Sequence, residues 1–219
     1  DGVVAVSPWI HDLCVDRYAV DPRRIRVFPN GVDLERFEPM DRGRARAILG
    51  LPQDRPVVVF VGHFIERKGP LRVLEAIRAH PEAGAVFIGD GPQRPSGPQV
   101  LFAGSVAHDE IPTWLSAGDV FALPTLEEGS CNAVIEAMAC GRAVITSDIP
   151  SIRDLTGPDA ARLVDPHDVT ALSEAIATLL AQESRRDELA RRARDRSRLF
   201  SLETRARGIL DWLETIAAA

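Results

Sequence analysis

The sequence lacks the features that mark several common protein classes. Its three cysteines have no CxxC spacing and its five histidines are scattered, so no metal-binding pattern occurs. No run approaches the roughly 18 apolar residues that a membrane-spanning helix needs, and no segment resembles a signal peptide. Internal repeats and low-complexity tracts are also missing. These absences predict a cytoplasmic protein with reduced thiols. Any contact with the inner membrane face is expected to be peripheral and to be made through a larger protein of which this chain is a part.

An excess of positive charge is missing as well. The chain carries a formal net charge of -6 at pH 7, and its pI is near 5.4. A protein that binds nucleic acid without regard to sequence usually presents basic charge to the phosphates, so this class is disfavoured. Any phosphate that the protein binds must therefore meet a local site. The 219 residues are 45% hydrophobic, which is enough to bury a sizeable core.

The sequence does contain a regular alternation of short apolar runs and helix-like stretches. The runs, several of them flanked by Gly or Pro, are typical of strands buried on both faces. The stretches between them, such as 71–79 and 111–117, predict right-handed crossovers and a parallel sheet covered by helices. The predicted fold class is α/β, Rossmann-like, with strands at Val57–Val61, Ala85–Ile88, Val100–Ala103, Val120–Leu123, Ala143–Thr146 and Ala161–Val164.

Both ends of the chain depart from this alternation. The opening Asp1–Ser7 has no initiator Met and predicts a strand followed by a turn, so we expect the chain to be part of a larger protein. A second strand at Ile25–Phe28 precedes a turn, which places a domain boundary near Gly31. From Asp168 onward apolar residues recur at helical spacing, so the tail is predicted to be helical.

The tail also contains seven arginines between Arg185 and Arg198, interleaved with three acidic residues. They fit either a patch for anionic lipid or a solvated helix face, and the acidic residues favour the second interpretation. The last apolar stripe, at 209–216, is expected to dock on a protein surface.

The strongest candidate for a binding site is the segment Pro124–Gly141, which runs from a strand end through a polar turn into a helix. In open α/β sheets, ligands bind beyond the carboxyl ends of the strands, where a helix points unpaired N–H groups at them. Gly129 would let the backbone approach a ligand closely. The amides that follow could bind phosphate oxygens with help from the helix dipole, and they belong to Ser130, Cys131, Asn132 and Ala133.

Two carboxylates of this segment, Glu128 and Glu136, are eight residues apart. The first lies on the turn and the second at least one turn inside the helix, so they could reach opposite ends of one ligand. A bidentate grip on ribose by Glu136 could dominate binding, because hydrogen bonds to charged groups contribute about 1.5–3 kcal/mol each. The alternative is that Glu136 is an exposed helix residue and Glu128 a loop acid.

A second glycine turn follows the predicted strand at 57–61 and contains His63, Arg67 and Lys68. Its two cations could neutralise a pyrophosphate, because Lys supplies a compact charge and Arg a bidentate fork. They could equally be surface cations that precede a helix. The histidines other than His63 are predicted to be structural.

A third glycine turn, Gly89-Asp90-Gly91, follows the predicted strand at 85–88. It lacks the full dinucleotide-binding fingerprint, so it supports the architecture more than an activity. It nevertheless falls on the same edge of the predicted sheet as the other two turns.

With these residues in place, nearly the whole chain resembles the C-terminal half of retaining glycosyltransferases of family 4, or group 1. These enzymes have the GT-B architecture of two Rossmann-like domains. Seven matches in the same order are far more specific than any single motif. They are VVAVS, IRVFPNGVD, VVFVGHFIERKG, FIGDGP, LFAGSV, IPTWLSAGDVFALPTLEEGSCNAVIEAMACGRAVI and ARLVDPHDVTALSEAI.

The resemblance implies a role for each matching residue. Glu128 would face the transferred sugar, and Glu136 would hold the ribose of a nucleotide-diphosphate sugar. Lys68 would contact the diphosphate and stabilise the leaving group, so Lys68 and Glu128 are the expected catalytic residues. Ser105 and Val106 would contact the base. No cofactor and no metal ion is expected, since cations and a helix N-terminus would supply the electrostatic stabilisation.

The chain departs from the family pattern at several points. The family usually has Arg where this chain has His63, so either His63 or Arg67 must contact the diphosphate there. The loop Gln93–Gln99 is shorter and richer in Pro and Gly than usual, and Ser151–Asp154 departs from the usual glycine-rich turn. The family's N-terminal domain, which supplies most of the acceptor site, is missing from this chain.

The resemblance therefore implies three segments. Residues 1–30 would be the final strand and helix of the N-terminal domain plus a linker, and residues 31–200 the nucleotide-sugar-binding domain. Residues 201–219 would form a helix that packs back toward the N-terminal domain. The parent protein would transfer a sugar, with retention at the anomeric carbon, to an unknown acceptor, whereas this chain alone would bind the donor weakly. A GT-B-fold epimerase or phosphorylase, or a non-catalytic nucleotide-binding or interaction module, stays open as an alternative.

Overall fold

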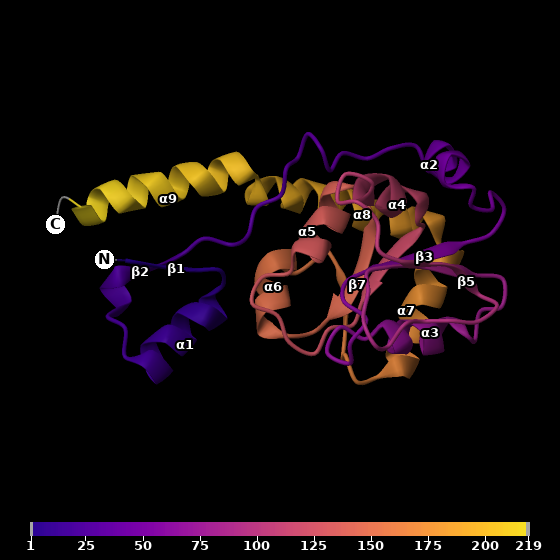
Figure 1. Cartoon of the computed structure of the whole chain (residues 1–219), viewed down its shortest axis with the longest axis horizontal. Coiled ribbons are helices and arrows are strands. Elements are labelled where there is room, and N and C mark those ends of the chain that lie inside the picture. The colour runs from indigo at the N-terminus through magenta and orange to yellow at the C-terminus, as the bar shows by residue number, and fades with distance from the viewer. Residues whose placement is uncertain (1, 218–219) are drawn as a thin grey trace.

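The computed structural model describes residues 2–217, and a six-stranded sheet forms the centre of its larger part (Figure 1). Neighbouring strands are all parallel, in the order β5-β4-β3-β6-β7-β8. The predicted α/β fold with a parallel sheet is therefore confirmed. The strands are β3 (Val57–Val61), β4 (Gly84–Ile88), β5 (Val100–Gly104), β6 (Val120–Leu123), β7 (Ala143–Ser147) and β8 (Arg162–Val164).

The four inner strands and the two edge strands differ in burial. Strands β3, β4, β6 and β7 are buried along their whole length. The prediction that all six runs are buried on both faces is wrong for the edges, because every residue of β5 is half-buried and Arg162 in β8 is exposed. An edge strand has a neighbour on one side only, so solvent reaches it.

Helices cover both faces of the sheet. Figure 1 shows α2 and α4 on one side and α3 and α7 on the other. Helix α2 packs with α4, α3 with α7, and α5 with α8. Apolar helix faces thus meet both sides of the buried strands, as a parallel sheet requires. The bounds are α2 Arg42–Leu49, α3 Pro70–Ile77, α4 Ile111–Ala117, α5 Asn132–Ala139, α6 Pro150–Thr156, α7 Val169–Ala181 and α8 Glu183–Ser197.

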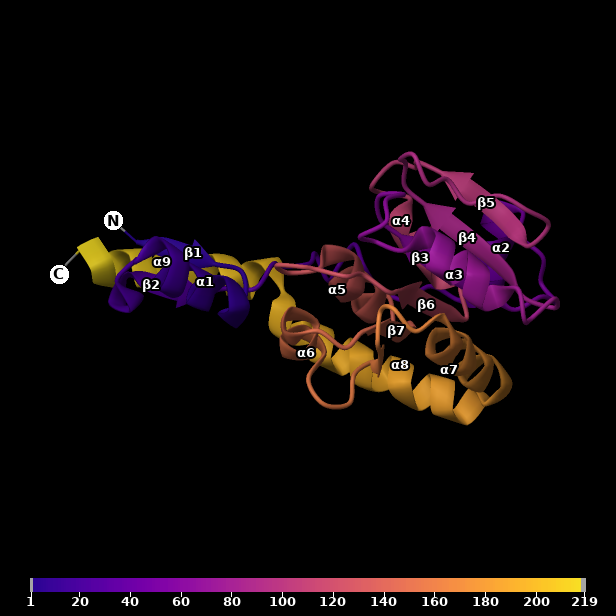
Figure 2. The same ribbon diagram turned by 90° about the horizontal axis from the view of Figure 1, so that it is seen from below.

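A smaller unit lies at the other end of the molecule, beside the C-terminal helix (Figures 1 and 2). Helix α9 packs against this unit through Trp212, whose ring centroid lies 6.0 Å from that of Phe28. Val32 and Ser201 form a parallel bridge, so the chain enters and leaves the larger part side by side. The unit contains β1 (Val3–Ala5), α1 (Pro8–Tyr18), a 3-10 helix (Pro22–Arg24) and β2 (Ile25–Val27), and a 3-10 turn (Arg198–Phe200) precedes α9 (Leu202–Ala217). The division into three functional segments stays a prediction.

Helix α8 carries the arginine-rich stretch, and part of that stretch faces the protein. The Arg186 side chain is only 10% exposed. Arg194 and Arg196 donate hydrogen bonds to backbone carbonyls at the ends of α5 and α6, at 3.1 and 3.0 Å. Arg192 pairs with Glu188 at 2.7 Å. These arginines are therefore engaged by groups of this chain. None of the helices within residues 2–217 is long and apolar enough to cross a membrane.

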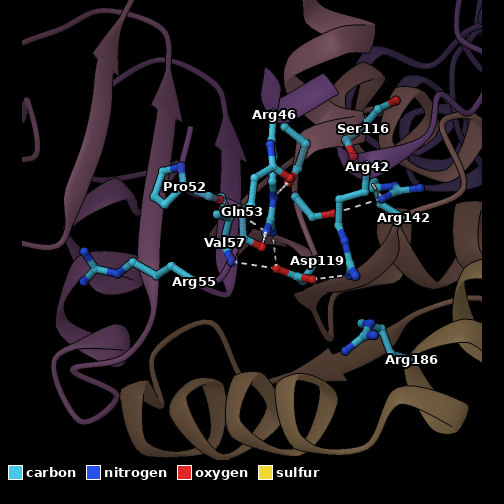
Figure 3. A network of polar contacts seen from close by, with 12 residues as sticks. Arg42, Arg46, Pro52, Gln53, Arg55, Val57, Ser116, Asp119, Arg142 and Arg186 are labelled. Carbon is cyan, nitrogen blue, oxygen red and sulfur yellow. Dashed lines mark hydrogen bonds and ion pairs between the residues drawn. The ribbon is translucent and has the colours of Figure 1, made fainter. Parts of the chain in front are cut away.

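A polar network centred on Asp119 joins three elements at the amino ends of the strands (Figure 3). The Asp119 carboxylate accepts hydrogen bonds from Arg42, from Arg46 at 2.6 Å and from the Val57 backbone N–H at 2.7 Å. Asp119 precedes β6, Val57 begins β3, and both arginines belong to α2. One buried carboxylate thus ties α2 to two central strands, at the edge of the sheet opposite the predicted site.

Candidate active site

The loops that follow β3, β4 and β6 meet at the carboxyl edge of the sheet. The Gly62 N–H donates to the Ile88 carbonyl at 2.9 Å, and the Leu126 N–H donates to the Arg67 carbonyl at 2.8 Å. The loops of neighbouring strands therefore hold one another through their backbones. This is the edge at which open parallel sheets place their ligands, and most of the predicted site residues lie on these loops.

The two glycines of the turn after β4 are required by backbone packing. Both have positive φ, 142° at Gly89 and 137° at Gly91. A Cβ at Gly89 would lie 2.0 Å from the Gly62 carbonyl oxygen, and one at Gly91 would lie 2.6 Å from that of Phe64. No side chain fits at either position. The turn is therefore shaped by its contact with the loop after β3, which fits the prediction that it supports the architecture.

Glu128 and Lys68 form a buried ion pair at the centre of this edge. The Glu128 side chain is 8% exposed and the Lys68 side chain 14% exposed, and the Lys68 ammonium contacts the Glu128 carboxylate directly. The Thr125 hydroxyl donates to the same carboxylate oxygen at 2.9 Å. Glu128 is a loop acid, as in the alternative interpretation, but it is buried and has fixed partners. A carboxylate and an ammonium are thus held together where a charged ligand would enter.

The other two groups of the loop after β3 occupy more exposed positions. The Arg67 guanidinium donates to the Glu127 carbonyl at 2.7 Å and lies 3.9 Å from the Glu128 carboxylate. The His63 ring contacts the Asp90 carboxylate at 3.1 Å, and these side chains are 73% and 74% exposed. Arg67 is therefore nearer than His63 to the buried ion pair.

Helix α5 begins at the end of the polar turn, as predicted, and the loop before it is tied to the linker. The Ser130 hydroxyl accepts a hydrogen bond from the Asn30 backbone N–H at 3.2 Å, and the Asn30 amide donates to Asn132 at 2.8 Å. Gly129 and Ala133 are half-buried on either side of this contact. The N-cap residue Cys131 makes no capping hydrogen bond of ordinary geometry with its side chain.

Cys131 lies between the two predicted carboxylates. Burial raises the pKa of its thiol to about 12, and the charges of Glu128 and Glu136 act in the same direction. The thiol therefore stays protonated at neutral pH and is no nucleophile. The charges of both carboxylates thus act on one side chain, with Glu128 before the start of α5 and Glu136 within the helix.

Glu136 lies in the second turn of α5, and its side chain is 12% exposed. It is not the exposed helix residue of the alternative interpretation. Burial raises the pKa of this carboxyl, while a hydrogen bond from His108 and the charges of His108 and Arg36 lower it. His108 Nε2 lies 3.4 Å from Glu136 Oε1. A buried carboxylate beside two basic side chains is a strong acceptor for hydroxyl groups.

His108 is a residue that the sequence interpretation assigned to structure alone. It lies two positions after Val106, in the loop that follows β5, where Ser105 is exposed and Val106 half-buried. The contact of His108 with Glu136 brings this loop to α5. Its position next to the predicted base contacts was the signal that could have identified it.

No group of three or more His, Cys, Asp or Glu side chains within residues 2–217 is placed to hold a metal ion. The expectation that the reaction needs neither metal nor cofactor stays a prediction.

Comparison with known proteins places this site in a family. The family model described as "Glycosyl transferases group 1" matches residues 41–196, which contain every residue of the predicted site. The chain belongs to the group 1 glycosyl transferases. A second model, "Glycosyltransferase Family 4", matches residues 1–36. The resemblance on which the sequence interpretation rested is therefore confirmed.

Relatives of this glycosyl transferase chain are enzymes of sugar transfer. It is 32% identical to the D-inositol 3-phosphate glycosyltransferase of Nocardioides sp., over 96% of this chain and 53% of the relative. It is 36% identical to the putative teichuronic acid biosynthesis glycosyltransferase TuaC of Bacillus subtilis, over 68% of this chain and 40% of TuaC. The chain thus spans about half the length of these relatives or less.

Solved structures agree on the fold. The sucrose-phosphate synthase of Thermosynechococcus elongatus is similar with a TM-score of 0.87 and 30% identity, over 100% of this chain and 59% of that one. HepE of Anabaena, in complex with UDP-glucose, has a TM-score of 0.87 and 21% identity, over 98% of this chain and 64% of HepE. The chain therefore has the fold of one half of a GT-B glycosyltransferase.

Proposed function

We propose that this chain is the donor-binding half of a retaining glycosyltransferase, which transfers a sugar from a nucleotide-diphosphate sugar to an acceptor bound largely by the rest of the parent protein. The observation that supports it best is the buried Lys68–Glu128 pair at the carboxyl edge of the sheet. Glu136 lies eight residues further along, in the second turn of the helix that starts there. A ligand that reaches all three residues needs a negatively charged part for Lys68 and hydroxyl groups for the carboxylates, and a nucleotide-diphosphate sugar has both.

In this mechanism, the bond between the anomeric carbon and the diphosphate oxygen breaks, and its electron pair leaves with the diphosphate. Lys68, with Arg67 near it, stabilises that developing negative charge. The Glu128 carboxylate faces the sugar and holds Lys68 in place before the donor binds. The acceptor hydroxyl oxygen then bonds to the anomeric carbon on the face that the diphosphate leaves, which retains the configuration, and its proton passes to the departing diphosphate oxygen. The amides at the start of α5 bind phosphate oxygens.

Replacing Glu136 with alanine should weaken nucleotide binding by at least about tenfold, because the ribose would lose two hydrogen bonds to a charged acceptor. Calorimetric titration of the full-length protein with UDP, GDP and ADP would measure this and name the base. HepE was solved with UDP and with UDP-glucose, so uridine nucleotides are the first to test. Folding should be preserved, since burial raises the pKa of the Glu136 carboxyl and its ionised form therefore costs stability at neutral pH.

The matched control is Glu174→Ala, which removes a carboxylate from α7, far along the chain from the site. It should leave the dissociation constant unchanged. Equal affinity of the Glu136 variant and the unchanged protein for every nucleotide would contradict a ribose contact at Glu136.

Sugar transfer should be insensitive to chelators. In the proposed mechanism the charge of Lys68 and the amides of α5 supply the electrostatic stabilisation that a divalent ion could otherwise give. Treatment of the full-length enzyme with EDTA should therefore change the rate by less than about twofold. A strict requirement for added Mg²⁺ or Mn²⁺ would contradict this mechanism.

Two other functions share parts of this site. An epimerase or a phosphorylase of the same fold would also bind a phosphorylated sugar, and a non-catalytic module would bind nucleotide without turnover. The family to which the chain belongs and the transferases among its relatives support transfer. Product analysis separates the three, because only a transferase releases nucleoside diphosphate together with a glycosylated acceptor.

A further inference from the structure

His108 is held between two elements that border the proposed ribose contact. Its Nε2 lies 3.4 Å from Glu136 Oε1, and its ring packs against the buried Phe37 with a centroid distance of 5.5 Å and an interplanar angle of 59°. The His108 side chain itself is 58% exposed. One ring nitrogen thus contacts the carboxylate, while the ring packs at a tilt against a buried aromatic side chain.

Among the residues that the structure describes, few other charged groups act on the Glu136 carboxylate. Arg36, from the segment before α2, is a second cation whose charge lowers its pKa. The thiols of Cys131 and Cys140 at the two ends of α5 have pKa values raised by burial to about 12, so they carry no charge there. The Glu110 carboxylate accepts a hydrogen bond from the Ala107 N–H at 3.0 Å, within its own loop. His108 is therefore the group in direct contact with Glu136.

We propose that His108 is a positioning residue of the donor site, which orients the Glu136 carboxylate and balances its charge so that both ribose hydroxyls meet an ionised acceptor. This role rests on the proposed ribose contact of Glu136. The hydrogen bond to Oε1 fixes the rotamer of the carboxylate, and each of its two oxygens keeps a lone pair for a ribose hydroxyl. It also makes the carboxylate available to the donor over a wider range of pH.

The pH range follows from the sign of each effect. Burial raises the pKa of the Glu136 carboxyl, and the contact with His108 lowers it again. A protonated carboxyl loses acceptor capacity, so donor affinity should fall as the pH drops through that pKa. Removing His108 should therefore raise the pH below which donor affinity falls.

The test is the dissociation constant of UDP, measured by calorimetry on the full-length protein from about pH 5.5 to about pH 8. His108→Ala should weaken binding by about tenfold at the acid end and by only about twofold to threefold at the alkaline end. His108→Gln, which keeps a hydrogen-bond donor but cannot carry a charge, should match the unchanged protein at the alkaline end and lose less affinity than His108→Ala at the acid end. His167→Ala, in an exposed loop before α7, is the matched control and should change neither value.

The double variant separates positioning from simple packing. In a Glu136→Gln background no carboxylate is left to protect, so adding His108→Ala should cost no further affinity at either pH. An equal loss at all pH values, with His108→Gln behaving like His108→Ala, would overturn the proposal and indicate a direct contact of the ring with the ligand. Unchanged binding in His108→Ala would also overturn it. If Glu136→Ala itself binds UDP normally, the ribose contact fails and the role of His108 falls with it.

Discussion

Replacing Lys68 with alanine in the full-length enzyme is expected to lower the rate of sugar transfer by about 10²–10³-fold. The Lys68 side chain is 14% exposed and pairs with Glu128 in the candidate active site. A compact charge in a site with little water stabilises the charge that develops on the departing diphosphate far more than a solvated charge does. The contact strengthens in the transition state, so the loss should appear mainly in kcat.

Arg67→Ala is the comparison for Lys68, because it removes the neighbouring cation of the same loop. The Arg67 side chain is 43% exposed and its guanidinium is already bonded to the Glu127 carbonyl, so this variant should lower the rate by less than Lys68→Ala does. Thermal unfolding must be measured in parallel, since Lys68→Ala leaves the buried Glu128 carboxylate without its cation. A folded Lys68→Ala enzyme with kcat within about fivefold of the unchanged enzyme would contradict a role in leaving-group stabilisation.

Binding measurements locate the contact on the ligand. UDP carries the diphosphate that Lys68 is proposed to contact, whereas uridine carries only the base and the ribose. Lys68→Ala should therefore weaken the binding of UDP and leave that of uridine unchanged, while Glu136→Ala should weaken both. The two variants together test whether Lys68 contacts the diphosphate and Glu136 the ribose, as the sequence interpretation predicts.

The fold could be predicted where buried apolar runs are bounded by residues that break regular structure. Strand β3 has the predicted bounds because Val57–Val61 lies between Pro56 and Gly62, and β6 ends at Leu123, directly before Pro124. The exposure of β5 and β8 could not be predicted in the same way. A strand becomes an edge through the order in which crossovers place it, and no local composition records that order.

In the candidate site, the loops could be predicted but the contacts between them could not. His108 and Glu136 are 28 residues apart and Asn30 and Ser130 are 100 apart, so no local pattern connects either pair.

The amino-acid composition does single out one residue of the site. Lys68 is the only lysine among the 219 residues, although Lys and Arg together number 26. A chain that otherwise uses arginine has its one lysine where a compact point charge suits a phosphate.

Replacing Asp119 with alanine is expected to lower the free energy of unfolding by about 3–5 kcal/mol, the largest stability effect that we predict for this chain. The Asp119 side chain is 8% exposed and accepts three hydrogen bonds (Figure 3). Its removal leaves the Arg46 guanidinium, whose side chain is 4% exposed, buried without a carboxylate. It also leaves the first N–H of β3, at Val57, without its acceptor. Urea unfolding of the full-length protein, followed by circular dichroism, would measure the change.

Two further variants show whether the buried charge left by Asp119→Ala causes the loss of stability. Arg42→Ala removes a partner of the same carboxylate whose side chain is 41% exposed, so it should cost less than about 1 kcal/mol. Asp119→Asn keeps an oxygen for the Val57 N–H but not the charge, and should fall between the other two variants. The network lies at the amino ends of the strands and the candidate site at their carboxyl ends, so the folded Asp119→Ala protein should bind UDP with unchanged affinity. An unchanged unfolding midpoint of the Asp119→Ala protein would mean that α2 is held to the sheet by its apolar contacts alone. A change in its UDP affinity would mean that the two edges of the sheet are coupled.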